Sequence, residues 1–587
     1  MNKKLNRTLK YLLLTILVFL LIPIPSQSQT KNYPKNQFQS PIKRELNLSG
    51  SFAEPRTNHF HSGLDLRIGG QEGEKVYSPF QGSVSRIKIQ AWGGGKNLYI
   101  DHPNGYTTVY MHLRNYSPKI EEYIRKYQYD KQTYEFDIEV EKGKLRIEKG
   151  ELIAYAGNTG SSGGPHLHFE IRNTKTQYII NPQHFGIEVI DTTLPYIQSL
   201  IIRPEGEFSR VEGMPDKQIY EVISPNQPRP KNNKTIKPND TIQATNQISL
   251  GIQAYDKSLG STSRNGIYSY KLLVDDEVFW QFQIDEFSFD QSRYINACID
   301  YEIYKNKNQK FLITKKLPNN QFPSFKTTNS TGIINLESNA IRKIEYIVQD
   351  FKQNTMSFTF YIQSLVSNPN TQIIPKSIPT HTFYWDKDNI IEDNQFKIKV
   401  PKKALYETSQ IDYLRTTDAN TQYPILKIES SSALHSNMII QMPLPNNIKP
   451  EYKRKMVVVE QKNKYQNSIS GEINQENIIA TTRNFGTYSL ALDTISPSIY
   501  PKNFKLNGKL KSKQKTITLR IRDKLSGISK YNGYINDKWV LMEYDGKSST
   551  LIYNIDYKEL NLPINTLRIE VQDQVGNSTT QAFTILK

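Results

Sequence analysis

Two histidines separated by one residue stand out as side chains that could do chemistry. His166 and His168 alternate with Leu167 and Phe169, and a period of two predicts a half-buried β-strand whose apolar residues face a core. Both imidazoles then lie on the opposite face, roughly 6–7 Å apart. This spacing allows one histidine to bind a metal ion while the other reaches a water molecule on the metal.

A second alternating segment, residues 58–68, supplies a histidine and a carboxylate with the same parity. His61 and Asp65 share one face of the expected strand, and Gly63 lies between them. The glycine leaves a space where a side chain would fill the coordination volume of a metal. His59 has the same parity, but no carboxylate follows it four residues later, so we interpret it as a rim residue.

A hairpin is expected over residues 97–113. An Asn-Gly pair at 104–105 lies between two alternating runs, which is a strong hairpin signal. On the second strand His112 has the parity of Tyr110, and we expect both on the polar face. His112 would thus be a third polar-face histidine, whereas His102 lies at the turn and is interpreted as structural.

An insertion and a small-residue loop complete this region. From residue 117 to about 142, apolar side chains at helical spacing predict a short surface helix among charged residues. Glycines between Gly157 and Gly164 allow the backbone to approach a metal or a substrate closely. The loop lacks the lysine–serine/threonine ending and the following helix of a phosphate-binding loop.

Three motifs occur in order in the first third of the chain: His61-Ser-Gly-Leu-Asp65, Tyr110-Met-His112-Leu and Gly-Gly-Pro-His166-Leu-His168-Phe-Glu170. Together they resemble the signature of the M23 (lysostaphin/LytM-like) zinc metallopeptidases. The resemblance covers roughly residues 45–187. The expected helix is longer than in the smallest members of that family.

The resemblance implies a zinc ion bound by His61, Asp65 and His168. Two imidazoles, one carboxylate and a water form the open site of a catalytic zinc rather than the closed site of a structural one. Asn158 and Glu170 are candidates for supporting these ligands, although no motif assigns either of them a role.

The resemblance also implies that His112 and His166 are catalytic residues that do not bind the metal. We expect His166 to act as general base toward a zinc-activated water and later to protonate the leaving amine. We expect His112 to hydrogen-bond the water or the tetrahedral oxyanion. The family further implies cleavage of peptide bonds in peptidoglycan, in the cross-bridges or the stems.

The N-terminus is typical of a secretory signal peptide. A basic start leads into the apolar run Tyr11–Ile24 and then small polar residues, which predicts cleavage near Ser28. An uncleaved anchor is the alternative. We therefore expect export to the periplasm, the cell envelope or the medium, and no membrane span after cleavage.

The composition limits the partners and the chemistry. The net charge is +18, an excess that favours a polyanionic partner, and secretion argues against nucleic acid. Seven of the nine histidines precede residue 185, so we place the chemistry in the N-terminal part. The only cysteine, Cys298, cannot form an intrachain disulfide, and we expect it to be buried.

The last two thirds of the chain contain an internal repeat. Motifs that begin at Asp191, Asp256 and Asp350 recur at Asp493, Asp523 and Asp573. The aspartates at the repeat turns fit Asx-turn capping, and calcium binding is the alternative. Each copy begins with a proline-marked linker, and we interpret the two copies as immunoglobulin-like β-sandwiches.

We therefore predict a mainly β chain: an N-terminal antiparallel β-sheet metallopeptidase domain with a short helical insertion, followed by several β-sandwich (Ig-like) domains. The expected limits are 1–28 for the signal peptide, 29–187 for the peptidase domain, 188–365 and 494–587 for the Ig-like sandwiches, and 371–490 for a further β-rich domain.

Three functions remain open at this point. The first is a secreted zinc endopeptidase that cuts peptidoglycan peptides, with β-domains that position it and contact other envelope proteins. The second is a zinc-binding surface scaffold that regulates another cell-wall hydrolase without cutting. The third is an endopeptidase for secreted proteins.

Overall fold

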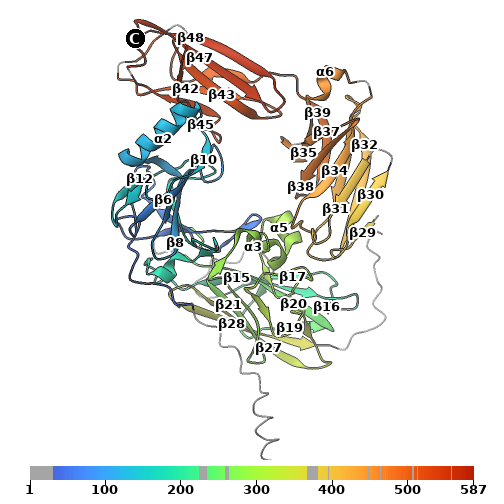
Figure 1. Cartoon of the computed structure of the whole chain (residues 1–587). Helices are drawn as coiled ribbons and strands as arrows, with labels where there is room; N and C mark the ends of the chain where they lie inside the picture. Colours follow the sequence, from blue (N-terminus) through green and yellow to red (C-terminus); the bar gives the residue numbers. More distant parts are fainter. Residues whose placement is uncertain are drawn as a thin grey trace, which may run out of the picture.

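The computed structural model describes residues 31–223, 234–257, 263–365, 381–393, 396–446, 448–462, 465–469, 471–505, 508–511, 513–556 and 558–586. Four β-rich regions follow one another around a ring, and the last returns to the first beside helix α2 (Pro118–Lys131) (Figure 1). The expectation of a mainly β chain with a helical insertion and several later β-regions is confirmed. The predicted signal peptide, residues 1–28, lies outside the described residues.

A long sheet organises the N-terminal region. Its strand order is β1 (Leu48–Gly50), β4 (Leu64–Arg67), β13 (His166–Asn173), β8 (Tyr106–Met111), β7 (Lys96–Asp101), β6 (Gly82–Ile89) and β10 (Phe136–Glu139). All of these pairs are antiparallel, and β13 lies between β4 and β8. The expected hairpin is present as β7 and β8. The strand with two histidines therefore has the other two histidine-bearing segments as its neighbours.

The segment 58–68 is not the single strand that its alternation predicts. It forms β3 (His59–Phe60) and β4, and residues 61–63 between them are irregular. The reason is that the two pieces have different partners: β3 pairs with β2 (Pro55–Arg56), whereas β4 pairs with β1 and β13. The chain turns at His61 to join the two sheets.

Strand β13 is buried on both faces rather than on one. Leu167 and Phe169 on the apolar face are fully buried, but so are Glu170 and nearly all of His168 on the polar face. A helical insertion from the next region covers this face, and its Phe289 ring lies 4.8 Å from the Arg172 guanidinium. The prediction of a half-buried strand was wrong because tertiary packing supplies a second cover.

The predicted surface helix is confirmed as α2. It buries Ile120, Ile124 and Gln128 and has a proline in its first turn, where no backbone N–H is needed. A smaller sheet has the order β5 (Lys75–Tyr77), β12 (Leu152–Ala156), β9 (Leu113–Tyr116), and its β9 leads from the long sheet directly into this helix.

The second region, residues 196–365, consists of two sheets with a shared core. One has the order β18 (Thr235–Ile236), β17 (Gln218–Val222), β15 (Tyr196–Pro204), β20 (Gln247–Tyr255), β24 (Leu312–Ile313), and β26 (Ile334–Asn335) also pairs with β20. The other has the order β16 (Arg210–Val211), β19 (Thr241–Thr245), β28 (Thr355–Ser364), β27 (Ile341–Gln349), β21 (Ser269–Val274), β22 (Glu277–Gln283), β25 (Phe325–Thr327).

The helical insertion of this region follows β22. It contains α3 (Phe289–Ser292), α4 (Ile295–Cys298) and α5 (Tyr301–Lys307). Strand β23 (Glu286–Phe287) pairs with β14 (Ile179–Ile180) of the long sheet, and the Ser292 hydroxyl accepts a bond from Phe60 N–H. Cys298 is fully buried, as expected.

The third and fourth regions are also pairs of sheets, each pair with its own core. In the third region, one sheet has the order β29 (His381–Phe383), β32 (Ser409–Thr417), β33 (Pro424–Glu429), β39 (Thr487–Leu492), β35 (Met456–Lys462), β36 (Tyr465–Ile469). The other sheet has the order β30 (Asn389–Asp393), β31 (Phe396–Val400), β34 (Met438–Pro443), β38 (Asn477–Thr482), β37 (Gly471–Asn474). In the fourth region, one sheet has the order β40 (Ser498–Pro501), β42 (Thr516–Arg522), β46 (Thr550–Asn554), β45 (Glu543–Asp545). The other sheet has the order β41 (Gly508–Lys509), β48 (Ser578–Leu586), β47 (Ile564–Asp573), β43 (Ile528–Ile535), β44 (Lys538–Val540).

Within the described residues, none of the helices combines the length and the apolar character that a membrane crossing requires. The domain limits and the Ig-like character expected from the sequence stay predictions, although the sheets fall into the same succession of regions.

Candidate metal centre and active site

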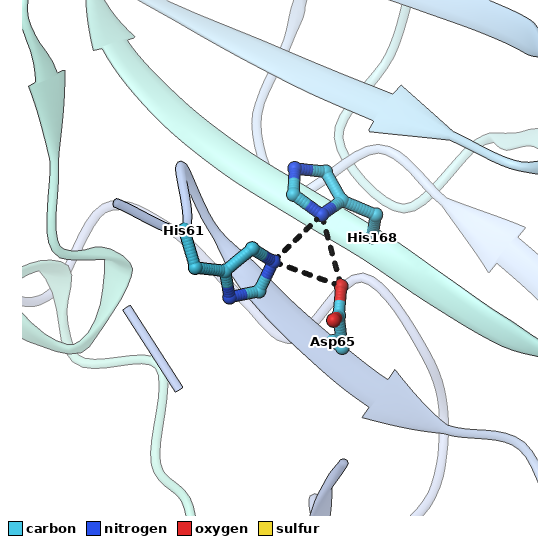
Figure 2. Close-up of side chains that lie close together, drawn as sticks. All are labelled: His61, Asp65 and His168. Atoms are coloured by element: carbon cyan, nitrogen blue, oxygen red, sulfur yellow. Dashed lines mark hydrogen bonds and ion pairs between the residues drawn. The ribbon is translucent and has the colours of Figure 1, made fainter. Parts of the chain in front are cut away.

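Three side chains meet between β3, β4 and β13. His61 Nε2 lies 3.1 Å from Asp65 Oδ1 and 3.1 Å from His168 Nδ1, and His168 Nδ1 lies 2.9 Å from Asp65 Oδ1. Figure 2 shows the three donor atoms directed toward one another. All three side chains are buried. The structure thus brings together the residues that the sequence predicts as metal ligands.

The remaining ring nitrogen of each of these histidines is already bonded. His61 Nδ1 donates to the carbonyl of Ser51 over 2.7 Å, and His168 Nε2 donates to Glu170 Oε1 over 3.0 Å. These bonds fix the tautomers, so that His61 Nε2 and His168 Nδ1 face the centre. Burial would lower the pKa of His168, but Asp65 and Glu170 raise it to about 9, so binding of a metal requires the loss of its Nδ1 proton.

Glu170 holds His168 from behind and is itself held by an arginine. It is fully buried, and Arg172 Nε donates to its Oε2 over 2.7 Å. Burial alone would raise the pKa of Glu170, but the Arg172 charge and the His168 bond lower it to about 2. Glu170 is therefore an anion, which makes His168 a stronger electron donor.

Asp65 has a further partner that the sequence did not reveal. Arg56 Nη2 donates to Asp65 Oδ2 over 2.5 Å and to Glu54 Oε1 over 2.8 Å. Arg56 lies on β2, and only the turn at His61 brings this strand back to β4. Burial would raise the pKa of Asp65, but the surrounding histidines hold it well below its usual range.

His166 and His112 lie beside the three donors. His166 Nε2 is 3.3 Å from Asp65 Oδ1, and its Nδ1 donates to the Gly164 carbonyl over 2.8 Å. His112 Nδ1 donates to the Thr159 carbonyl over 2.8 Å, and the two rings are 4.8 Å apart between centroids. Each of these histidines therefore has its Nδ1 bonded to a backbone carbonyl, which leaves its Nε2 facing the three donors.

His112 reaches the site by a different route from the one expected. Tyr110 is fully buried and packs on Phe169, so its face of β8 is the core face and not the polar one. A continued strand would direct His112 into the core as well. His112 instead has φ +60°, a left-handed conformation that ends β8 and turns the imidazole toward His166. The predicted shared polar face was wrong.

Gly63 permits a close approach of its backbone to β13, which a side chain at this position would prevent. A Cβ at this position would lie 2.4 Å from the Phe169 carbonyl oxygen and 3.0 Å from His168 Nε2. The space that the sequence analysis assigned to a metal is therefore filled by β13 and the His168 ring.

The other candidate residues are peripheral. His59 is exposed, and its Nδ1 donates to the Thr57 carbonyl. His102 is buried between the Gln81 carbonyl and Thr108 Oγ1, at 2.8 Å from each. The Asn158 carbonyl accepts a bond from Lys547 of the fourth region. Within the described residues, the Asn158 side chain forms no hydrogen bond with the three donors.

The three donors fit a divalent metal ion. Ligands about 2.0–2.2 Å from one tetrahedral ion lie roughly 3.3–3.6 Å apart, a few tenths of an ångström more than the observed edges of 2.9–3.1 Å. Two imidazole nitrogens and one carboxylate suit zinc and leave a fourth position for water.

The fourth region contacts the rim of this site. Lys547 Nζ donates to the carbonyls of Asn158 and Ser162 in the glycine-rich loop before β13. Behind it, the nearly buried Lys96 pairs with Glu543 over 2.8 Å. The fourth region thus closes the ring of regions at the loop that supports His166.

Comparison with known proteins agrees with this geometry. Residues 59–129 and 133–182 match the model of Peptidase family M23, and residues 380–493 match the model of a Zu5-like domain. Over 136 residues the chain is 32% identical to an uncharacterized metalloprotease of Haemophilus influenzae, a match that covers 22% of this chain and 23% of that relative.

Two solved structures are similar over the same region. A zinc-containing peptidase from Vibrio cholerae is 24% identical, with 27% of this chain and 41% of that chain covered and a TM-score of 0.19. The catalytic domain of lysostaphin from Staphylococcus simulans is 21% identical, with 24% and 90% covered and a TM-score of 0.18. On the family match and the metalloprotease relative, the N-terminal region is an M23 metallopeptidase domain.

Proposed function

We propose that the protein is an exported zinc-dependent endopeptidase that hydrolyses peptide bonds in peptidoglycan. The observation that carries this proposal is the convergence of five side chains: the three donors His61, Asp65 and His168, with His112 and His166 beside them. Each imidazole has one nitrogen bonded away from the centre and the other directed toward it.

A bound zinc would supply Lewis acidity toward a water molecule and a peptide carbonyl. His61, Asp65 and His168 would hold it. His166 is the proposed general base, because its Nδ1–H bond to the Gly164 carbonyl leaves Nε2 free to accept a proton. The protonated His166 could then deliver this proton to the leaving amine.

His112 suits a role as hydrogen-bond acceptor. Burial and the neighbouring His168 and His166 lower its pKa to about 3, and its Nδ1–H is bonded to the Thr159 carbonyl. A neutral His112 can orient a water molecule by accepting a hydrogen bond from it. Stabilisation of an oxyanion, which the resemblance also implies, would require a proton on Nε2 that the low pKa opposes.

Peptidoglycan as substrate is supported by the family resemblance and by charge. The chain has a net charge of +18, which favours association with an anionic cell wall. Export is supported by the predicted signal peptide. A scaffold without activity would not require His112 and His166 to be held beside the metal ligands.

The test incubates purified, zinc-loaded protein with peptidoglycan and identifies the released muropeptides by mass spectrometry. We expect new peptide termini from the wild type, which also reveal the bond that is cut. His166→Ala should bind zinc with little change but release products at least about 100-fold more slowly.

The matched control is His381→Ala, which removes a histidine from β29 in the third region. It should behave as the wild type. Uncut muropeptides from folded, zinc-loaded wild-type protein would contradict the proposal and favour the regulatory scaffold. Cleavage of unfolded protein substrates but not of peptidoglycan would favour the third function.

A further inference from the structure

The six aspartates of the internal repeat form two clusters. Asp191, Asp256 and Asp350 meet in the first, and Asp493, Asp523 and Asp573 meet in the second. Within each cluster, one carboxylate oxygen of every aspartate lies within 4.8 Å of the others. These residues are separated by up to 159 positions in the chain, so only the tertiary fold brings them together.

The two clusters are built in the same way. The first aspartate precedes the opening strand of its region (β15 or β40), and the second follows the strand paired with it (β20 or β42). The third begins the turn of the last hairpin. There Asn354 Nδ2 donates to Asp350 Oδ2 over 2.6 Å, and Asn577 Nδ2 donates to Asp573 Oδ2 over 2.7 Å.

Turn capping accounts for only part of this arrangement. It explains the bonds that the third aspartate of each cluster accepts from its own turn, and also those that Asp191, Asp493 and Asp523 accept from residues two to four positions later. It does not explain why three carboxylates from separate loops converge. Asp256 is 5% exposed, and its Oδ1 has no hydrogen-bond partner in the described part of the chain.

The negative charge in both clusters is incompletely balanced. None of the six aspartates forms a salt bridge within the described ranges. Lysines lie near both clusters: Lys257 and Lys352 beside the first, and Lys455, which donates to Asn577 Oδ1, beside the second. Within the described ranges no ammonium group forms an ion pair with these carboxylates, so their mutual repulsion is not relieved by direct pairing.

The first cluster also lines a small cavity. It measures about 30 Å³ and is bounded by all three aspartates and by Leu48 and Asn181 of the N-terminal region. This is enough space for one ion. In the second cluster, the Ser526 N–H donates to Asp493 Oδ2, while its hydroxyl is buried without a partner in the described part.

We propose that each cluster binds one calcium-type divalent cation through carboxylate oxygens. An all-oxygen donor set with several carboxylates favours calcium or magnesium over zinc. Oxygens on opposite sides of a calcium ion lie about 4.6–5.2 Å apart, so carboxylate oxygens within 4.8 Å of one another can bind the same ion.

The positions of the clusters indicate what such ions would do. Asp191 lies on the segment from the M23 domain into the second region, and Asp493 lies on the segment from the third region into the fourth. A cation at each place would connect the incoming segment to two loops of the following sandwich. It would fix the orientation of that sandwich, whether or not the protein cuts peptidoglycan.

The test uses the full chain, freed of calcium with a calcium-selective chelator and kept zinc-loaded. Calcium is titrated by isothermal calorimetry, with magnesium in a parallel titration. We expect two calcium ions per chain. Asp256→Asn and Asp523→Asn should each remove one, because the substitution keeps the size and a capping oxygen but removes the charge. Asp418→Asn is the matched control, since Asp418 caps an exposed turn outside both clusters.

Thermal unfolding gives a second readout, because the difference in unfolding midpoint between each variant and the wild type should change sign when calcium is added. Without calcium, Asp256→Asn and Asp523→Asn should raise the unfolding midpoint because they relieve repulsion. With calcium, the wild type should be the more stable protein. A wild type that takes up no calcium, or variants that keep its full calcium stoichiometry, would overturn the proposal. Uptake of magnesium alone would overturn the choice of calcium.

Discussion

At the scale of single residues, the site depends on which nitrogen of each histidine is occupied. Ser51, Thr159 and Gly164 each accept an imidazole N–H through a backbone carbonyl, and Glu170 accepts the fourth. Three of these bonds would survive side-chain substitution of the acceptor. The Glu170 carboxylate is the exception, so it offers a direct test of tautomer control.

Glu170→Gln should weaken zinc binding about 10–100-fold. The neutral amide no longer strengthens His168 as a donor, and it leaves the buried Arg172 without its anionic partner. Competition with a chromogenic zinc chelator measures the affinity. Glu72→Gln, on an exposed turn, is the control. An affinity equal to that of the wild type would show that Glu170 does not support the metal site.

Cys298 should be unreactive in the folded protein. Its side chain is fully buried, and burial raises the pKa of the thiol, so little of the reactive thiolate is present. A chromogenic disulfide reagent should therefore label it rapidly only after denaturation. Rapid labelling of the native protein would indicate that α4 opens in solution.

At the scale of elements, the close approach of β4 and β13 decides the geometry of the donors. Phe169 pairs with Leu64, and His168 pairs with Asp65. Gly63 lies at the end of β4, where a side chain would meet β13. The separation of these strands therefore sets the distance between Asp65 on β4 and His168 on β13. It also sets how far both lie from His61 in the irregular segment before β4.

Gly63→Ala should destabilise the protein by about 1–3 kcal/mol and weaken zinc binding. The added Cβ would lie 2.4 Å from the Phe169 carbonyl oxygen, so the strands must move apart. Denaturant unfolding with and without zinc separates the two effects. Gly163→Ala is the control because nothing lies within 4 Å of its added Cβ. Equal effects of both substitutions would contradict this explanation.

At the scale of the whole molecule, the ring in Figure 1 closes where the fourth region meets the M23 domain. Tyr129 on α2 donates to Glu559, and Tyr531 donates to Glu135, each over 3.1 Å. Lys547 bonds the loop that supports His166. The region farthest from the site along the chain is thus in contact with its rim.

Gly546→Val should displace this contact. A Cβ at Gly546 would lie 2.6 Å from the Trp92 indole, so the fourth region must move away from the M23 domain. Hydrogen exchange of residues 157–164 should become faster, because Lys547 no longer bonds their carbonyls.

The matched control combines Gly546→Val with Trp92→Ala, which removes the obstructing ring and should restore slow exchange. Trp92 is 55% exposed, so its removal should cost little stability by itself. Unchanged exchange in Gly546→Val would show that the fourth region does not shield the loop.

Much of the site could be predicted from local spacing. The separations within the His61–Asp65 and His166–His168 motifs, together with the Asn-Gly hairpin, selected the strands and the ligands because adjacent residues on a strand have a fixed geometry. Period two also identified the apolar face of β13 correctly. It failed at His61 and His112, where a turn and a positive φ interrupt the alternation.

The sequence by itself therefore determined the mainly β character, the helical insertion, the candidate ligands and the repeated aspartate motifs, since all of these depend on residues close together in the chain. Only the tertiary structure placed Arg56 on Asp65, covered the polar face of β13, gathered the aspartates into two clusters and brought Lys547 to the loop before His166. These are contacts between distant segments, and their geometry is set by how the sheets pack rather than by any local period.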